Sequence, residues 1–462
     1  MSTREAPATS SHAREEAARI EVGHTAVAPV TAWALVAAFL GLLAAAALYQ
    51  HAGGPAGPDE ASGKTAWSHL SSLTTAVPRQ VAERRAAGDA SPWRLLVAAN
   101  RAVLAGLEAF EGALEEEARV GQLLRPRAQL ALTTWLGVGN ERVYKGRGTW
   151  LFYREDVDHV TGPGFLEPGQ VARRVRSAAE WTAPPVADPV PAITRLHEQL
   201  GARGILLVVV PTPVKPSVHP ERLARAYDRH DAPVQNASYE AFVERLRQRG
   251  VAVFDPAPGL VADAGRDGIP QYLATDTHWR PEAVERTAAR LARFVEERVA
   301  LPAAGDPGYR VERQEAEHVG DTAAMLDLPA TQHRYPPERV TIGRVLGADG
   351  SPWRPSRSAD VLVLGDSFSN IYSTPSLGWG ESAGLAEHLS AALRRPVDRI
   401  VQNDQGAFAT RARLARELAG GTDRLAGKRV VIYQFATREL SSGDWKVIDL
   451  HPAAATPGPA GR

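Results

Sequence analysis

The feature that most constrains the fold is a series of short, uninterrupted apolar runs after residue 138. They read ILLVVV at 205–210, VAVF at 251–254, VLVL at 361–364, IV at 400–401 and VVIY at 430–433. Stretches with helical periodicity separate them, near residues 190–200, 238–249, 281–299, 380–394 and 410–419. Apolar strands that alternate with helices are typical of a parallel sheet covered on both faces. The sequence therefore predicts an α/β domain whose ligands bind beyond the carboxyl ends of the strands.

Composition narrows the classes of function. The chain has 53 basic and 53 acidic side chains, so its formal net charge is zero. This balance argues against a nucleic-acid partner, because phosphate-binding chains usually carry a basic excess. The absence of cysteine excludes disulfides, thiolate metal ligands and a cysteine nucleophile. At 462 residues, the chain is long enough for two or three units.

One segment bears on location. Residues 29–49 (PVTAWALVAAFLGLLAAAALY) carry no charge, and about twenty helical residues cross a hydrocarbon core of about 30 Å. Arginines precede the segment and only Lys64 follows it closely, which favours a cytoplasmic amino end and an exported main body. We expect residues 1–28 to be a cytoplasmic tail and residues 29–49 to be a single transmembrane anchor. A cleaved signal peptide and a buried core helix are the alternatives.

The rest of the chain divides where its composition changes. Residues 50–137 are expected to be a linker and helical spacer, because residues 51–64 are rich in Gly and Pro and an amphipathic helical pattern follows from Ser91. That helix is expected to pack on the main domain or on a partner. Residues 138–450 form the expected main domain, and residues 451–462 are expected to be a disordered tail.

The strongest local signal is Gly365-Asp366-Ser367-Phe368-Ser369, which directly follows the VLVL run. Glycine permits a sharp turn, and a serine placed after a buried strand is presented to a cleft as a nucleophile. Backbone N–H groups beyond the turn can stabilise an oxyanion. The spacing does not match the G-x-S-x-G elbow of α/β-hydrolases, and a plain Asp-Ser turn is the alternative.

A serine nucleophile needs a base, and Asp276-Thr277-His278-Trp279 offers one. A histidine two residues from an aspartate can be oriented by that carboxylate while its other nitrogen faces the serine. The alternatives are a structural loop histidine or a metal-ligand pair with Asp276. A metal site needs a third ligand, and none is close in sequence. The two motifs together predict Ser-His-Asp catalysis at one edge of the sheet.

Together with Val143–Tyr153 and the VVVPTPVKPSVHPERL stretch, these motifs resemble the alginate O-acetyltransferases. More broadly, they are similar to SGNH hydrolase-like proteins that acetylate polysaccharides at bacterial inner membranes. The resemblance covers residues 138–450 and implies an SGNH-like three-layer sandwich with a central parallel sheet. The order of the motifs fits this branch, because Asp276 and His278 precede Ser367, whereas ordinary GDSL esterases carry the serine block first.

The resemblance also implies roles for individual residues. Ser367 corresponds to the acetyl-accepting nucleophile, His278 to the general base and acid, and Asp276 to the orienting carboxylate. The backbone N–H groups of Ser367 and Gly406 correspond to the oxyanion donors, with an ordinary turn as the alternative for Gly406. Ser369 is a second hydroxyl in the same turn, and the sequence leaves its role open.

Three residues are expected to contact the substrate, namely Lys215, Arg438 and Asn403. A solvated loop is the alternative for Lys215, and pairing with Glu439 is the alternative for Arg438. Gln434 stands where the family usually has a glutamate, so the role of that side chain is open.

The resulting hypothesis is a membrane-anchored, periplasmic O-acetyltransferase of the bacterial inner membrane that acetylates an exported polysaccharide through a serine acyl-enzyme. The resemblance implies no cofactor and no metal. It implies that a small acetyl ester or a membrane-bound O-acyltransferase supplies the acetyl group, with export machinery as a further partner. The alternatives are a carbohydrate acetylesterase with the same triad and a non-catalytic glycan-binding scaffold.

Overall fold

The computed structural model describes residues 28–52, 66–86, 91–117, 119–177, 183–227, 231–303 and 305–450. The chain divides into two compact units, Met1–Arg125 and Pro126–Arg462. Nearly all of the predicted cytoplasmic tail and the whole of the predicted disordered tail lie outside the described residues.

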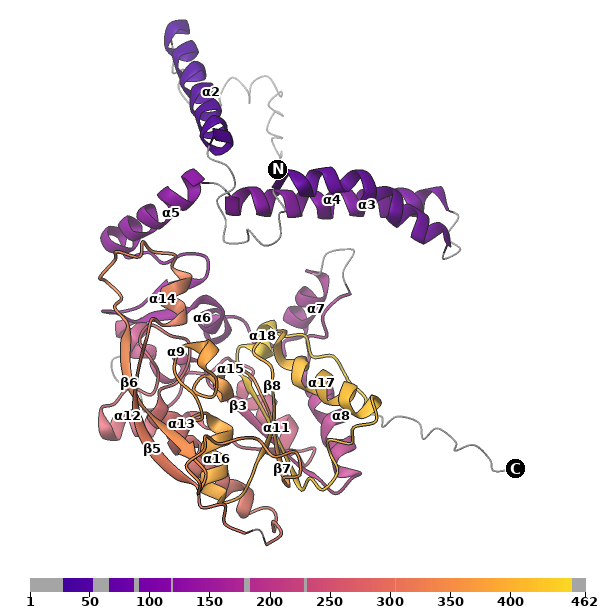
Figure 1. Cartoon of the computed structure of the whole chain (residues 1–462), viewed down its shortest axis with the longest axis vertical. Helices are drawn as coiled ribbons and strands as arrows, with labels where there is room; N and C mark the ends of the chain where they lie inside the picture. Colours follow the sequence, from indigo (N-terminus) through magenta and orange to yellow (C-terminus); the bar gives the residue numbers. More distant parts are fainter. Residues whose placement is uncertain are drawn as a thin grey trace, which may run out of the picture. The chain divides into compact units, whose positions relative to one another are not determined.

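The described residues of the first unit include helices α2 (Pro29–Ala52), α3 (Ala66–Ala86) and α4 (Pro92–Glu117), and α5 (Arg119–Ala131) begins near its end. Helix α4 begins at the proline after Ser91, as predicted, and packs against α3 (Figure 1). Gly106 of α4 faces Leu73 of α3 so closely that any larger residue would overlap it. Helix α2 covers the uncharged segment, but within the described part of the chain no helix is long and apolar enough to cross a membrane. The predicted transmembrane anchor is therefore not confirmed.

The second unit is built on a five-stranded sheet in the order β4-β3-β9-β7-β8. All neighbouring strands are parallel. The strands are β3 (Leu206–Thr212), β4 (Ala252–Val253), β7 (Val361–Gly365), β8 (Asp398–Val401) and β9 (Val430–Ala436). Each coincides with one of the predicted apolar runs. Because the strands are parallel, the residues that follow β3, β7 and β9 meet at one edge.

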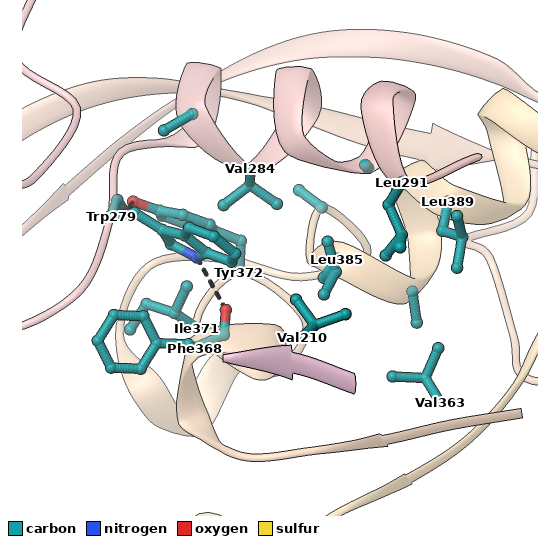
Figure 2. Close-up of a cluster of buried hydrophobic side chains, with 14 of the residues drawn as sticks. Val210, Trp279, Val284, Leu291, Val363, Phe368, Ile371, Tyr372, Leu385 and Leu389 are labelled. Atoms are coloured by element: carbon teal, nitrogen blue, oxygen red, sulfur yellow. Dashed lines mark hydrogen bonds between the residues drawn. The ribbon is translucent and has the colours of Figure 1, made fainter. Parts of the chain in front are cut away.

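Successive residues of each strand pack on opposite faces of the sheet, which is why the runs are apolar throughout. Val208 and Val210 join one core cluster, whereas Leu207 and Val209 join the other. Helices α12 (Ala257–Asp267), α13 (Pro281–Glu296) and α16 (Leu385–Leu393) cover the first face, where Figure 2 shows Val284 and Leu291 of α13 beside Leu385 and Leu389 of α16. Helices α8 (Pro189–Gly201), α11 (Tyr239–Arg247) and α17 (Ala409–Ala419) cover the second. The predicted α/β architecture is confirmed.

Further helices and two antiparallel strand pairs lie outside this sheet. The helices are α5 (Arg119–Ala131), α6 (Arg154–Thr161), α7 (Pro168–Arg176), α9 (Lys215–Val218), α10 (Pro220–Leu223), α14 (Asp321–Met325), α15 (Ser367–Asn370) and α18 (Glu439–Ser442). Two antiparallel hairpins pair β1 (Val143–Lys145) with β2 (Leu151–Tyr153) and β5 (Arg310–His318) with β6 (Glu338–Leu346). The β5–β6 hairpin was not predicted, because β5 is mostly charged and exposed and has no apolar run.

A buried ion cluster at the amino end of β8 allows a test of the packing, because it lies at the edge opposite the serine and histidine motifs. Arg424 donates to both oxygens of Asp398 at 2.7 and 2.6 Å, and the Lys428 ammonium lies 3.3 Å from that carboxylate. We expect Asp398→Ala to lower the free energy of unfolding by about 3 kcal/mol, because Arg424 and Lys428 lose the buried carboxylate that they share. The two cations keep Glu417 and backbone carbonyls as partners.

Glu198→Ala is the matched control, because its 3.8 Å pair with Arg195 is exposed. We expect a change below about 0.5 kcal/mol for this variant. Denaturant unfolding measures both variants, and equal effects would contradict a structural role for the buried cluster.

Candidate active site

The serine turn is fixed to the central strand by Asp366. Its carboxylate accepts hydrogen bonds from the N–H of Phe368 at 2.9 Å and the N–H of Ala436 at 2.7 Å. The side chain of Gln434 completes the attachment: its Nε2 donates to Asp366 Oδ1 at 2.9 Å, and its Oε1 accepts the Asp366 N–H at 3.1 Å. Helix α15 therefore begins at Ser367 with its first turn held against the end of β9.

The histidine motif lies in the loop before α13 and is tied to the same turn. An isolated antiparallel β-bridge pairs Tyr272 with Trp279, and the Leu273 N–H donates to the His278 carbonyl at 3.1 Å. The Trp279 indole N–H donates to the Phe368 carbonyl at 2.8 Å (Figure 2). The Tyr372 hydroxyl donates to the Trp279 carbonyl at 2.8 Å. These contacts hold the two motifs side by side, although they are about ninety residues apart in the sequence.

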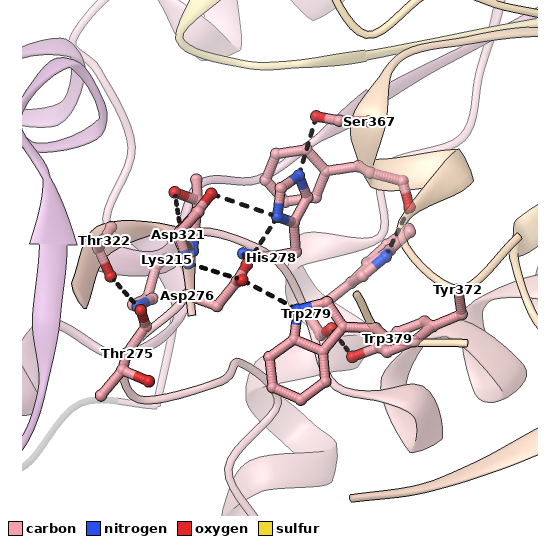
Figure 3. Close-up of polar contacts among 12 residues, drawn as sticks. Lys215, Thr275, Asp276, His278, Trp279, Asp321, Thr322, Ser367, Tyr372 and Trp379 are labelled. Carbon is pink, nitrogen blue, oxygen red and sulfur yellow. Dashed lines mark hydrogen bonds and ion pairs between the residues drawn. The ribbon is translucent and has the colours of Figure 1, made fainter. Parts of the chain in front are cut away.

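The structure brings Ser367, His278 and Asp276 together as one hydrogen-bonded chain (Figure 3). His278 Nε2 lies 2.8 Å from Ser367 Oγ, and His278 Nδ1 lies 2.7 Å from Asp276 Oδ1. The histidine and aspartate side chains are buried, whereas Ser367 is partly exposed. An ionised Asp276 holds the proton on Nδ1, which leaves Nε2 free to accept the serine proton.

The pKa values of the pair shift in opposite directions. Burial opposes ionisation of Asp276, but its hydrogen bonds from His278 and from the Asp321 N–H hold its pKa below the usual range. Burial also opposes protonation of His278, yet the hydrogen bond and charge of Asp276, aided by Asp321, raise its pKa above 6.5. The carboxylate therefore stays ionised and favours the imidazolium form that a general base passes through.

Asp321, which lies outside the two predicted motifs, contributes a further carboxylate to the site. Asp276, His278 and Asp321 each offer a possible metal-ligand atom within 4.8 Å of the others. However, both oxygens of Asp276 already accept N–H groups: Oδ1 from the ring and backbone of His278, and Oδ2 from Asp321 and Trp379. A carboxylate with its lone pairs so engaged orients a histidine better than it binds a cation.

The geometry also distinguishes the two serines of the turn. Ser369 is buried, and its hydroxyl donates to the Asp366 carbonyl at 2.9 Å. Only Ser367 of the two faces His278. Ser367 begins α15 and Gly406 begins the 3₁₀ helix η4 (Gly406–Phe408), so neither backbone N–H has an acceptor within its own helix. Both residues border the same small pocket.

The predicted substrate residue Lys215 does not border the pocket beside Ser367. Its side chain is fully buried, and its ammonium donates to the carbonyls of Leu151 at 2.7 Å and Ala274 at 3.3 Å. Burial lowers the pKa of Lys215 to about 8. The alternative of a solvated loop is therefore wrong, and direct substrate contact receives no support from this placement. Lys215 instead fixes the β2 hairpin to the loop that carries Asp276.

The other two predicted substrate residues, Arg438 and Asn403, border the pocket beside Ser367. The ion pair of Arg438 is with the buried Asp156 at 2.9 Å, and the charge of Glu439 acts on Arg438 as well. Asp156 could not be identified from sequence, because it lies 282 residues from its partner. Asn403 accepts a hydrogen bond from the Asn370 side chain at 3.3 Å.

Comparison with known proteins gives the geometry a context. The family model described as "SGNH hydrolase-like domain, acetyltransferase AlgX" matches residues 143–437. The probable alginate O-acetylase AlgJ of Pseudomonas aeruginosa is 27% identical over 270 residues, which cover 55% of this chain and 61% of that protein. Its counterpart from Pseudomonas fluorescens is 29% identical over 210 residues, which cover 45% and 47%. The chain thus spans less than two thirds of these relatives.

Two solved structures are similar to this chain over about two thirds of its length. The O-acetyltransferase domain of Pseudomonas putida AlgJ matches with a TM-score of 0.48 and 22% identity, over 65% of this chain and 92% of that one. AlgX of Pseudomonas aeruginosa matches with a TM-score of 0.43 and 17% identity, over 65% and 66%.

The Gln434 contacts predict a pH-dependent effect of Gln434→Glu. The carboxylate could keep its contact with Asp366 only while protonated, because two ionised carboxylates at that distance repel. We expect the variant to lose about 3 kcal/mol of unfolding free energy at pH 8 and clearly less at pH 5. Thermal unfolding at the two pH values measures the difference.

Gln248→Glu is the matched control, since Gln248 makes the same kind of contact with Glu244, at 2.8 Å, on the surface. Solvent screens that pair, so its pH dependence should be slight. A Gln434→Glu variant as insensitive to pH as this control would refute the assigned role of Gln434.

Proposed function

We propose that this chain, which belongs to the family of SGNH hydrolase-like acetyltransferase domains represented by AlgX, transfers acetyl groups to hydroxyls of an exported polysaccharide. The observation that carries the proposal is the Ser367–His278–Asp276 chain at the carboxyl edge of the sheet. The related AlgJ proteins are named as alginate O-acetylases, which supports a polysaccharide acceptor.

In the first half-reaction, His278 Nε2 removes the proton from Ser367 as the serine oxygen attacks the carbonyl carbon of the acetyl donor. The carbonyl oxygen gains negative charge, which the N–H groups of Ser367 and Gly406 would stabilise. The tetrahedral intermediate then collapses, the bond to the leaving group breaks, and His278 returns its proton to that group. Acetyl-Ser367 remains on the enzyme.

In the second half-reaction, a sugar hydroxyl takes the place of the leaving group. His278 removes its proton, the sugar oxygen attacks the acetyl carbon, and the bond to Ser367 breaks as His278 reprotonates the serine. Asp276 stays ionised in both steps and stabilises the imidazolium, as its depressed pKa supports. The cycle needs no cofactor or metal, and the acetyl donor is a small ester or the product of a membrane-bound O-acyltransferase.

We further propose that the acceptor lies along the pocket bordered by Asn403 and Arg438. The guanidinium of Arg438 suits an acidic sugar, because it can bind a carboxylate through two hydrogen bonds. Its pairing with Asp156 holds it in place before the substrate arrives.

We also propose an extracytoplasmic location, reached through the uncharged segment 29–49. In cells that express the full chain, we expect the protein in the membrane fraction after alkaline extraction, with its main domain accessible to protease in spheroplasts. Recovery in the cytosol would contradict the location, and a mature amino terminus beyond residue 49 would replace the anchor by a cleaved signal.

Ser367→Ala tests the acyl-enzyme directly. The wild-type chain incubated with a chromogenic acetyl ester should gain one acetyl group on the peptide that contains Ser367, read by mass spectrometry. The variant should lose this label and at least about 10³-fold of the ester cleavage, because no nucleophile remains.

Ser369→Ala is the matched control, since that buried hydroxyl faces the Asp366 carbonyl rather than His278. The control should keep the acetyl label on Ser367. Acetyl transfer by the Ser367→Ala variant at the wild-type rate would contradict the mechanism. If added oligosaccharide never gains acetyl groups while the ester is still cleaved, the protein is an esterase instead.

A further inference from the structure

A second carboxylate, that of Asp321, lies against the imidazole of His278 on the side of Asp276 (Figure 3). Its Oδ2 is 3.6 Å from His278 Nδ1, compared with 2.7 Å for Asp276 Oδ1. Asp321 begins α14 and is 31% exposed at its side chain, whereas the Asp276 side chain is 2% exposed. The proton on Nδ1 is thus close to two carboxylates, one fully buried and one partly buried.

Asp321 also forms hydrogen bonds with Thr277 and Asp276 of the turn that carries His278. Its Oδ1 accepts the Thr277 N–H at 2.6 Å and the Thr277 hydroxyl at 3.0 Å, and its own N–H donates to Asp276 Oδ2 at 3.0 Å. This approach depends on Gly320, because a Cβ there would lie 2.1 Å from the Thr275 carbonyl oxygen. The absence of a side chain at Gly320 therefore allows Asp321 to lie against the turn.

Burial and the charge of Asp276 raise the pKa of Asp321 to about 6. Four further charged groups surround the pair. Lys215 attracts both carboxylates, and Arg438 opposes protonation of His278. Asp156 lies near enough to interact with His278, and Glu338 accepts the N–H groups of Ala274 and Thr275 at the base of the loop. Replacing Asp321 leaves these four residues in the chain, but it also removes the charge that most raises the pKa of the buried Lys215.

We propose that Asp321 is a positioning residue of the active site: it fixes the Asp276–His278 turn and adds a second negative charge that stabilises the His278 imidazolium. The inference rests on the proposed acetyl transfer through Ser367. A purely structural Asp321 would hold the turn but would leave the proton affinity of His278 unchanged.

The test is Asp321→Asn, which keeps an oxygen for Thr277 and the backbone N–H for Asp276 but removes the charge. We expect kcat for acetyl-ester cleavage on the high-pH plateau to fall about 3- to 10-fold with KM little changed, because the imidazolium is less stabilised. The acid limb of kcat/KM should move by about 0.5–1 pH unit to lower pH, since loss of a nearby negative charge lowers the pKa of His278.

Two variants serve as controls. Asp321→Glu keeps the charge and should leave the acid limb near its wild-type position. Asp327→Asn removes an exposed charge just after α14 and should change neither kcat nor the limb. NMR titration of the His278 ring in the Ser367→Ala background gives the same shift without turnover.

The outcomes separate the two claims. A wild-type chain that neither cleaves esters nor acquires acetyl on Ser367 overturns the proposed function. An active wild type whose Asp321→Asn variant keeps the wild-type acid limb and His278 titration overturns the role of Asp321, even if melting temperature or kcat falls.

Discussion

The candidate site depends on how the buried carboxylate of Asp276 is compensated. A charge removed from water costs several kcal/mol unless hydrogen bonds replace the lost hydration. Here the replacements come from the backbone and ring of His278, the backbone of Asp321 and the indole of Trp379. Asp321 lies 45 residues from Asp276 and Trp379 lies 103 residues from it, so the lost hydration is replaced only when these segments fold together. The protonation state of the histidine is thus a property of the tertiary structure.

Ser367 is positioned by a network of hydrogen bonds between polar side chains. Three polar side chains lie at or near the carboxyl ends of three adjacent strands and hydrogen-bond to one another, namely Thr212, Gln434 and Asp366. Gln434 suits the centre of this group, because an amide both donates to a carboxylate and accepts a backbone N–H. The parallel topology supplies the neighbours, and the polar contacts fix the angle at which Ser367 leaves β7. A fully connected network of this kind is rigid, as a nucleophile requires.

The fold could be predicted because strands buried on both faces leave an unmistakable apolar run, whereas β5 leaves none. The contacts of His278 with Ser367 and Asp276 could be predicted because the three residues lie in two compact local motifs. What the sequence could not give were partners joined only by folding: Asp321 to Thr277, Glu338 to Thr275, and Arg438 to Asp156. Lys215 was misjudged for the same reason. Its local sequence suggests a loop, and only the carbonyls of Leu151 and Ala274 reveal a buried cation.

On the proposed mechanism, the triad by itself does not distinguish transfer from hydrolysis, since water and a sugar hydroxyl react through the same steps. The distinction must come from positioning. A hydroxyl held in reactive geometry gains an effective concentration of up to about 10⁵–10⁸ M, which far exceeds that of bulk water. Ser367 borders a pocket that Asn403 and Arg438 also border, so an acceptor held in this pocket would lie beside the acetylated serine. Arg438 is already oriented by Asp156, so it can hold an acidic acceptor without first being ordered. The contacts along this rim, rather than the triad, would therefore decide whether the acetyl group passes to a sugar or to water.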